Sequence, residues 1–179
     1  MNSRLLRRSA DALTIGRAVC GLPLILALQA GWQPLAWGLL LIAGLSDAAD
    51  GWLARKAGGG TSWGARLDPL TDKVLIVAPL LWLAASQRLP LWAVWLLLAR
   101  ELLISGWRAG ADDGAPASWS GKAKTILQFL SLLLLLWPAT WISHAVLNQI
   151  GWWLFWPSLL LALSSAAGYL RPRSTTHQR

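Results

Sequence analysis

Charged side chains are scarce in this sequence: Asp, Glu, Lys and Arg make up 13% of its 179 residues, against roughly 25% in an average soluble domain. Hydrophobic residues make up 55%, and the mean hydropathy is +0.47. A soluble domain of this size leaves much of its surface in water and could not hide so many apolar side chains. The composition therefore disfavours a soluble domain, excludes a disordered chain, and indicates a protein that lies in lipid.

Cysteine and acidic residues are also few. The single cysteine, Cys20, excludes an internal disulfide framework and a cysteine-based metal site. Eight acidic residues face 16 basic ones, which gives a net charge of +8. In a soluble protein this balance would suggest nucleic acid. Here the basic residues fall between long apolar runs, so we expect no nucleic-acid partner but anchoring at a lipid membrane and anionic ligands at its surface.

Apolar runs long enough to cross a membrane dominate the chain, since a span needs roughly 20 such residues. They lie near residues 12–30, 34–54, 66–86, 89–108, 121–140 and 150–170. Turn-forming residues interrupt the pattern at 31–34, 87–90 and 148–151. The sequence therefore predicts an all-α, polytopic membrane protein with about six transmembrane helices, formed as a single membrane domain over residues 1–179.

The basic residues indicate the orientation of these helices. They gather in residues 4–8, 55–73, 100–124 and the basic tail 171–179, whereas the other connections contribute only Arg88. Because positively charged connections stay on the cytoplasmic side, both termini are predicted to be cytoplasmic. Arg17 interrupts the first apolar run, so we expect that run to be kept as a span and not cleaved as a signal peptide. A multi-pass protein of a bacterial-type inner membrane is the expectation.

Four of the eight carboxylates fall in one window of the sequence, between the second and third apolar runs. They are Asp47, Asp50, Asp68 and Asp72. Ionisable groups at membrane depth are costly, which favours a functional interpretation. The first two are three residues apart and the last two are four apart, so on helices each pair shares one face. Two such helices could bring four carboxylates together.

Four close carboxylates cannot all stay ionised without a compensating charge. A hard divalent cation supplies that charge, and ligation by oxygen alone favours Mg²⁺ or Mn²⁺ over zinc. Gly51 and Gly64 leave space beside the two pairs, and Arg55 could meet a phosphate oxygen. The residues therefore indicate metal-assisted phosphoryl chemistry at the cytoplasmic face. The alternative is that these acids only pair with the basic residues around them.

The spacing of these residues also carries a resemblance. The segment reads Asp-x-x-Asp-Gly-x-x-Ala-Arg, then eight residues, then Gly-x-x-x-Asp-x-x-x-Asp, over residues 47–72. This resembles the signature of the CDP-alcohol phosphatidyltransferase family, with every position present. The resemblance implies a six-helix membrane enzyme, expected as a homodimer. Such an enzyme displaces CMP from a CDP-alcohol, usually CDP-diacylglycerol, with the hydroxyl of a second alcohol.

The resemblance also implies roles for single residues. A two-metal site holding Mg²⁺ or Mn²⁺ would be formed by Asp47, Asp50, Asp68 and Asp72. The last of these, Asp72, would also be the catalytic base that takes the acceptor proton. The cytidine diphosphate would be bound by Asp47, Gly51, Ala54, Arg55, Gly64 and Asp68, with Thr61 as a further contact.

A second polar belt, residues 100–128, bears on the acceptor alcohol. Arg100 and Arg108 are two helical turns apart and point the same way, and Lys122 and Lys124 begin the next span. Converging cations suit a phosphorylated acceptor, although anchoring at the membrane would also explain them. This belt is similar to the branch of the family whose acceptor is sn-glycerol 3-phosphate. We expect Glu101 to pair with Arg100 or Lys122.

Two alternatives stay open from the residues. The same chemistry could serve another acceptor, either phosphatidylglycerol in a cardiolipin-type synthase or inositol phosphate. A divalent-cation transporter would also place carboxylates in the membrane, but its polar residues should continue through several spans to the far side. Here they stop at one face.

Overall fold

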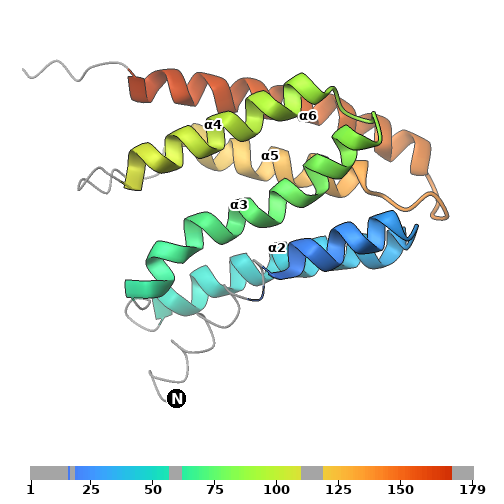
Figure 1. Cartoon of the computed structure of the whole chain (residues 1–179), viewed down its shortest axis with the longest axis horizontal. Helices are drawn as coiled ribbons and strands as arrows, with labels where there is room; N and C mark the ends of the chain where they lie inside the picture. Colours follow the sequence, from blue (N-terminus) through green and yellow to red (C-terminus); the bar gives the residue numbers. More distant parts are fainter. Residues whose placement is uncertain (1–15, 17–18, 57–61, 110–118, 171–179) are drawn as a thin grey trace, which may run out of the picture.

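The computed structural model describes residues 16, 19–56, 62–109 and 119–170, and describes side chains for 16, 19–46, 73–106 and 123–166. In these segments the backbone is helical and contains no strand (Figure 1). A first helical segment, Val19–Gln29, precedes the helices α2 (Gln33–Lys56), α3 (Ser62–Ala85), α4 (Leu91–Ala109), α5 (Trp119–Leu135) and α6 (His144–Leu170). The all-α prediction is confirmed for this part of the chain.

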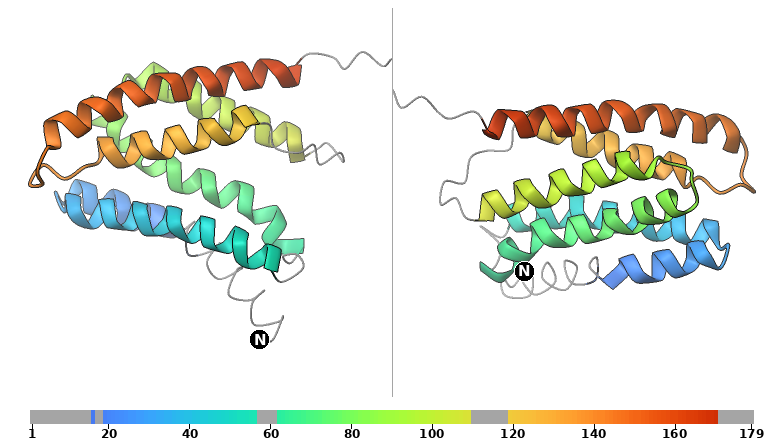
Figure 2. Two further views of the ribbon diagram at one scale, coloured as in Figure 1. Left: turned by 180° about the vertical axis from the view of Figure 1, so that it is seen from behind. Right: turned by 45° about the horizontal axis from the view of Figure 1, so that its top comes forward.

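The helices run back and forth along one long axis, which gives the bundle two ends (Figures 1 and 2). At the end on the left of Figure 1, α2, α4 and α6 finish while α3 and α5 begin. We call this the signature end, because residues 47–56 and 62–72 lie there. The opposite end holds the connections 30–32, 86–90 and 136–143.

Two connections at the opposite end use the same helix stop. Trp32 N donates to Ala27 O at 2.8 Å after Gly31, whose φ is +76°. Arg88 N donates to Leu83 O at 2.9 Å after Gln87, whose φ is +57°. In this type of cap the left-handed residue turns the chain while the next N–H satisfies a free carbonyl of the last turn. The predicted breaks at 31–34 and 87–90 are thereby confirmed.

The third predicted break, at 148–151, is wrong. These residues lie inside α6, which begins at His144, and α5 already ends at Leu135. Asn148 lies within the helix, and its Nδ2 donates to Leu135 O at 3.0 Å and to Leu134 O at 3.3 Å. A polar side chain here satisfies carbonyls at the end of α5, whose backbone groups have no helical partner. The true connection is 136–143.

Gly151 lets α5 and α6 pack closely, and these two helices share the most extensive contact in the described bundle. A Cβ atom built on Gly151 would lie 2.8 Å from Leu135 N and 2.8 Å from Leu134 Cβ. The side chain of Ser131, also on α5, donates to Gly151 O at 2.7 Å. The glycine is needed here for close approach of two backbones, not for a turn.

Gly151→Ala is therefore expected to lower the free energy of unfolding by about 1–3 kcal/mol, because α5 backbone would have to move. Gly38→Ala is the matched control, since nothing lies within 4 Å of a Cβ at that position of α2. An alanine there is expected to raise helix stability by up to about 1 kcal/mol. Thermal unfolding of both variants in one detergent checks this, and equal midpoints for the two would contradict it.

The surface of the bundle is unusually apolar. One described helix, over His144–Ala166, is long and apolar enough to cross a membrane, and only 28% of its most apolar window is buried. Large side chains also point outward on other helices, among them Leu103 at 73% exposure and Ile42 at 64%. A core helix of a soluble protein would be mostly covered. Exposed apolar helices are what lipid contact requires.

Candidate active site

The signature residues occupy two antiparallel helices at the signature end. Asp47, Asp50, Gly51, Ala54 and Arg55 lie in the last part of α2, and Gly64, Asp68 and Asp72 lie in the first part of α3. The helical backbone that the spacing argument requires is present at both carboxylate pairs, and α2 and α3 are in contact. The side chains of these eight residues and the whole of Thr61 lie outside the described residues.

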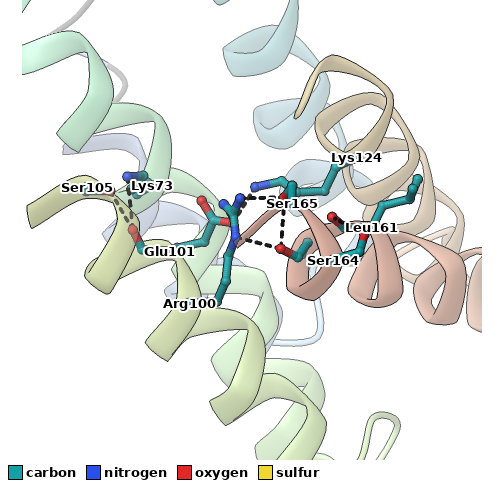
Figure 3. A network of polar contacts seen from close by, with 9 residues as sticks. Lys73, Arg100, Glu101, Ser105, Lys124, Leu161, Ser164 and Ser165 are labelled. Atoms are coloured by element: carbon teal, nitrogen blue, oxygen red, sulfur yellow. Dashed lines mark hydrogen bonds and ion pairs between the residues drawn. The ribbon is translucent and has the colours of Figure 1, made fainter. Parts of the chain in front are cut away.

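The described part of the signature end contains a buried charge network centred on Glu101 of α4 (Figure 3). Its carboxylate Oε1 accepts hydrogen bonds from Lys124 Nζ of α5 and, at 2.9 Å, from Arg100 Nη1. The side chains of Arg100 and Lys124 are only 9% and 8% exposed. Buried ions in contact with opposite charges avoid the cost of an unpaired charge in a low-dielectric interior.

Arg100 extends this network to α6. Its Nε donates to Ala162 O at 2.8 Å, and its Nη2 donates to Ser165 Oγ at 2.7 Å. Ser165 Oγ in turn donates to Ala162 O at 2.9 Å. All three guanidinium nitrogens are thus bonded to the protein, so Arg100 holds α4 against α6 at the level of the network.

Lys73 joins the network to α3. Its Nζ donates to the backbone oxygen of Glu101 at 3.2 Å, and Ser105 Oγ donates to that same oxygen. Lys73 directly follows Asp72 in the sequence, so the network reaches the turn of α3 that carries Asp72. Four helices, α3 to α6, are therefore tied together beside the predicted metal site.

The structure brings together only some of the cations predicted for the acceptor. Lys124 and Arg100 converge on Glu101, whereas Arg108 of α4 and Lys122 of α5 have side chains outside the described range. The predicted pairing of Glu101 with Arg100 is confirmed, and Lys124 is a second partner that sequence spacing did not identify. Among the described side chains of this network, three are cations and one is a carboxylate.

The comparisons with known proteins agree with the signature. Residues 7–164 match the CDP-alcohol phosphatidyltransferase family. The chain therefore belongs to that family, and it is an enzyme that transfers a substituted phosphate group. Enzymes of this family generally use divalent metals. The transporter interpretation is set aside.

Several bacterial relatives are similar over most of their length. The chain is 35% identical over 158 residues to the CDP-diacylglycerol–glycerol-3-phosphate 3-phosphatidyltransferase of Escherichia coli (strain K12), covering 82% of this chain and 83% of the relative. The proteins with the same description from Shigella sonnei (strain Ss046) and Shigella flexneri serotype 5b (strain 8401) match with the same identity and coverage. The chain is thus a transferase similar to enzymes of phosphatidylglycerol synthesis.

Proposed function

We propose that this enzyme transfers the phosphatidyl group of CDP-diacylglycerol to sn-glycerol 3-phosphate, forming phosphatidylglycerophosphate and CMP. The observation that carries the choice of acceptor is the 35% identity, over 82% of the chain, to relatives described by that reaction. The cation-rich network at the signature end supports it, because an acceptor with a phosphate group needs positive charge nearby.

In the proposed reaction the primary hydroxyl of glycerol 3-phosphate attacks the phosphorus that carries diacylglycerol. A new phosphorus–oxygen bond forms there, and the bond to the bridging oxygen of the diphosphate breaks, so that CMP leaves. Asp72 takes the proton of the attacking hydroxyl. Holding both substrates in one site replaces an encounter in solution by a positioned attack, which lowers the barrier.

The donor set fits a two-metal site. Asp47, Asp50, Asp68 and Asp72 supply only oxygen ligands, as Mg²⁺ and Mn²⁺ prefer, and they stand on helical positions of α2 and α3. Such ions, when bound, offset the negative charge that develops on the departing CMP. Arg55 and Thr61 bind the diphosphate in this proposal, while Gly51, Ala54 and Gly64 leave space for the nucleotide.

The acceptor phosphate is proposed to lie between α4 and α5, near Arg108, Lys122 and Lys124. Arg100 contributes positive potential there while its nitrogens stay bonded to Ala162, Ser165 and Glu101. The enzyme is further proposed to cross the inner membrane several times as a homodimer, with both termini and the signature end at the cytoplasmic face. The apolar exterior and the basic residues at that end support this orientation.

An acceptor panel tests the proposal. Purified protein is supplied with CDP-diacylglycerol and Mg²⁺ or Mn²⁺, and CMP release is followed with glycerol 3-phosphate, phosphatidylglycerol, inositol phosphate, inositol or serine. Release with glycerol 3-phosphate alone, abolished by a chelator of divalent cations, is the expected result. Release only with phosphatidylglycerol or inositol phosphate would keep the family chemistry and overturn the acceptor.

A further inference from the structure

Arg88 is an isolated charge at the opposite end of the bundle. It is the only Asp, Glu, Lys or Arg residue in the ranges 19–46, 74–99 and 126–170. The carboxylates nearest to it in sequence are Glu101 and Asp72, which are 13 and 16 residues away. At the rise of a helix these separations correspond to about 20 Å or more. The two helices that Arg88 connects, α3 and α4, therefore place no carboxylate next to it along the chain.

The neighbours of Arg88 in the structure are neutral. Its Nη2 donates to Leu135 O and to Asn148 Oδ1, and the guanidinium carbon lies 5.7 Å from the centre of the Trp82 ring. Within the described part of the chain, no hydrogen bond of Nε or Nη1 is found, so these two nitrogens are open to water or to a ligand. Burial lowers the pKa of Arg88 from its usual value, but an arginine remains protonated at neutral pH. Arg88 is thus a half-buried cation without a carboxylate partner among the described residues.

A pocket of about 480 Å³ opens beside this cation. Its lining includes Gln87, Arg88, Pro90, Leu91 and Trp152. α4 begins at Leu91, so the positive end of the helix dipole lies at the same pocket. The N–H groups of Ala93 and Val94 already donate to Pro90 O, which leaves the N–H of Leu91 among the lining residues. A fixed guanidinium and a helix N-terminus together form a site suited to a phosphate group.

The rim of the pocket is apolar. Leu91 is 70% exposed and the adjacent Trp92 is 58% exposed. A ligand that places a phosphate on Arg88 would therefore have hydrocarbon surface available next to it. Tryptophan is enriched where a membrane meets water, and the opposite end carries a further cluster of Trp37, Trp137 and Trp141 with ring centres 5.0–5.4 Å apart.

We infer that the pocket at Arg88 binds the phosphate group of an anionic phospholipid, at the end of the bundle away from the reaction. This site is separate from the signature residues and rests on the proposed location in a membrane. Its role is binding, since Arg88 is remote from the carboxylates of the signature end. The Asn148 carbonyl and the end of α5 hold the guanidinium in place for that lipid.

Lipid titration followed by native mass spectrometry tests the inference. Delipidated protein in a neutral detergent receives short-chain phosphatidic acid or short-chain phosphatidylcholine. The wild-type protein is expected to bind one phosphatidic acid that phosphatidylcholine does not replace, and Arg88→Gln is expected to bind it about tenfold more weakly. Arg88→Lys keeps the charge, and its affinity for phosphatidic acid should lie between those of the wild type and Arg88→Gln. Arg173→Gln, which changes net charge equally, should match the wild type.

Inorganic phosphate, added without lipid, separates the two sources of the ligand. Stabilisation by phosphate that is lost in Arg88→Gln would support the anion site with a free ion as occupant. Equal phosphatidic acid affinity in wild type, Arg88→Lys and Arg88→Gln would overturn the inference. CMP release is measured on the same samples, so failure of the proposed reaction would be seen separately from failure of lipid binding.

Discussion

Asp72→Asn is expected to reduce metal-dependent CMP release by about 10³-fold or more. The asparagine cannot accept the proton of the attacking hydroxyl, and loss of a general base alone costs about 10²–10⁴-fold. The same change removes one charged ligand from the proposed metal site, which lowers the affinity for the divalent cation. The assay is CMP release from CDP-diacylglycerol with saturating glycerol 3-phosphate, over a series of Mg²⁺ concentrations.

The shape of the metal series separates the two roles of Asp72. If only metal affinity were lost, high Mg²⁺ would restore the rate, whereas loss of the base leaves a low rate at saturation. Asp112→Asn is the matched control, because this acid lies outside the signature; its activity should equal that of the wild type. An Asp72→Asn enzyme that retained more than a tenth of the rate at every Mg²⁺ concentration would contradict the assignment.

Glu101→Gln is expected to lower the free energy of unfolding by about 3 kcal/mol or more. The change leaves Arg100 and Lys124, whose side chains are 9% and 8% exposed, without the one carboxylate they share. Removing one partner of a buried ion pair typically costs about 3–5 kcal/mol, since the other charge stays buried and uncompensated. Thermal or denaturant unfolding in detergent measures the loss.

A double-mutant cycle shows whether the loss comes from the ion pair. Lys124→Gln removes one of the two cations, so Glu101→Gln should cost less in that background than in the wild type. Glu101→Asp keeps the charge on a shorter side chain and serves as the matched control. Additive effects of the two substitutions, or a cost below about 1 kcal/mol for Glu101→Gln, would contradict a shared buried carboxylate.

Much of the helical plan could be predicted from local patterns. Apolar runs and turn residues located the helices on either side of Gly31 and Gln87, because a helix stop depends on a few neighbouring residues. The same reasoning failed at residues 148–151. Asn148 and Gly151 look like turn residues in the sequence, but in the bundle one caps carbonyls of α5 and the other admits its backbone.

In the candidate site, too, the local spacing of residues could be predicted, whereas contacts between distant helices could not. The spacing of Asp47, Asp50, Asp68 and Asp72 identified the family that the comparisons then showed. The partners of Lys124 and Arg88 could not be predicted, because each depends on helices that are far apart in the chain. Lys124 meets Glu101, 23 residues away, and Arg88 meets Asn148, 60 residues away.

The sequence by itself determined that this protein is an apolar helical enzyme with a CDP-alcohol phosphatidyltransferase signature, because hydropathy, helix stops and signature spacing are local properties of the chain. Only the tertiary structure decided which charges are paired. α4 packs against α3 and α6, and Lys124 of α5 reaches the same Glu101 carboxylate as Arg100, while the end of α5 gave Arg88 neutral partners beside an open pocket. Contacts between distant helices depend on how their faces pack, and no local pattern contains that information.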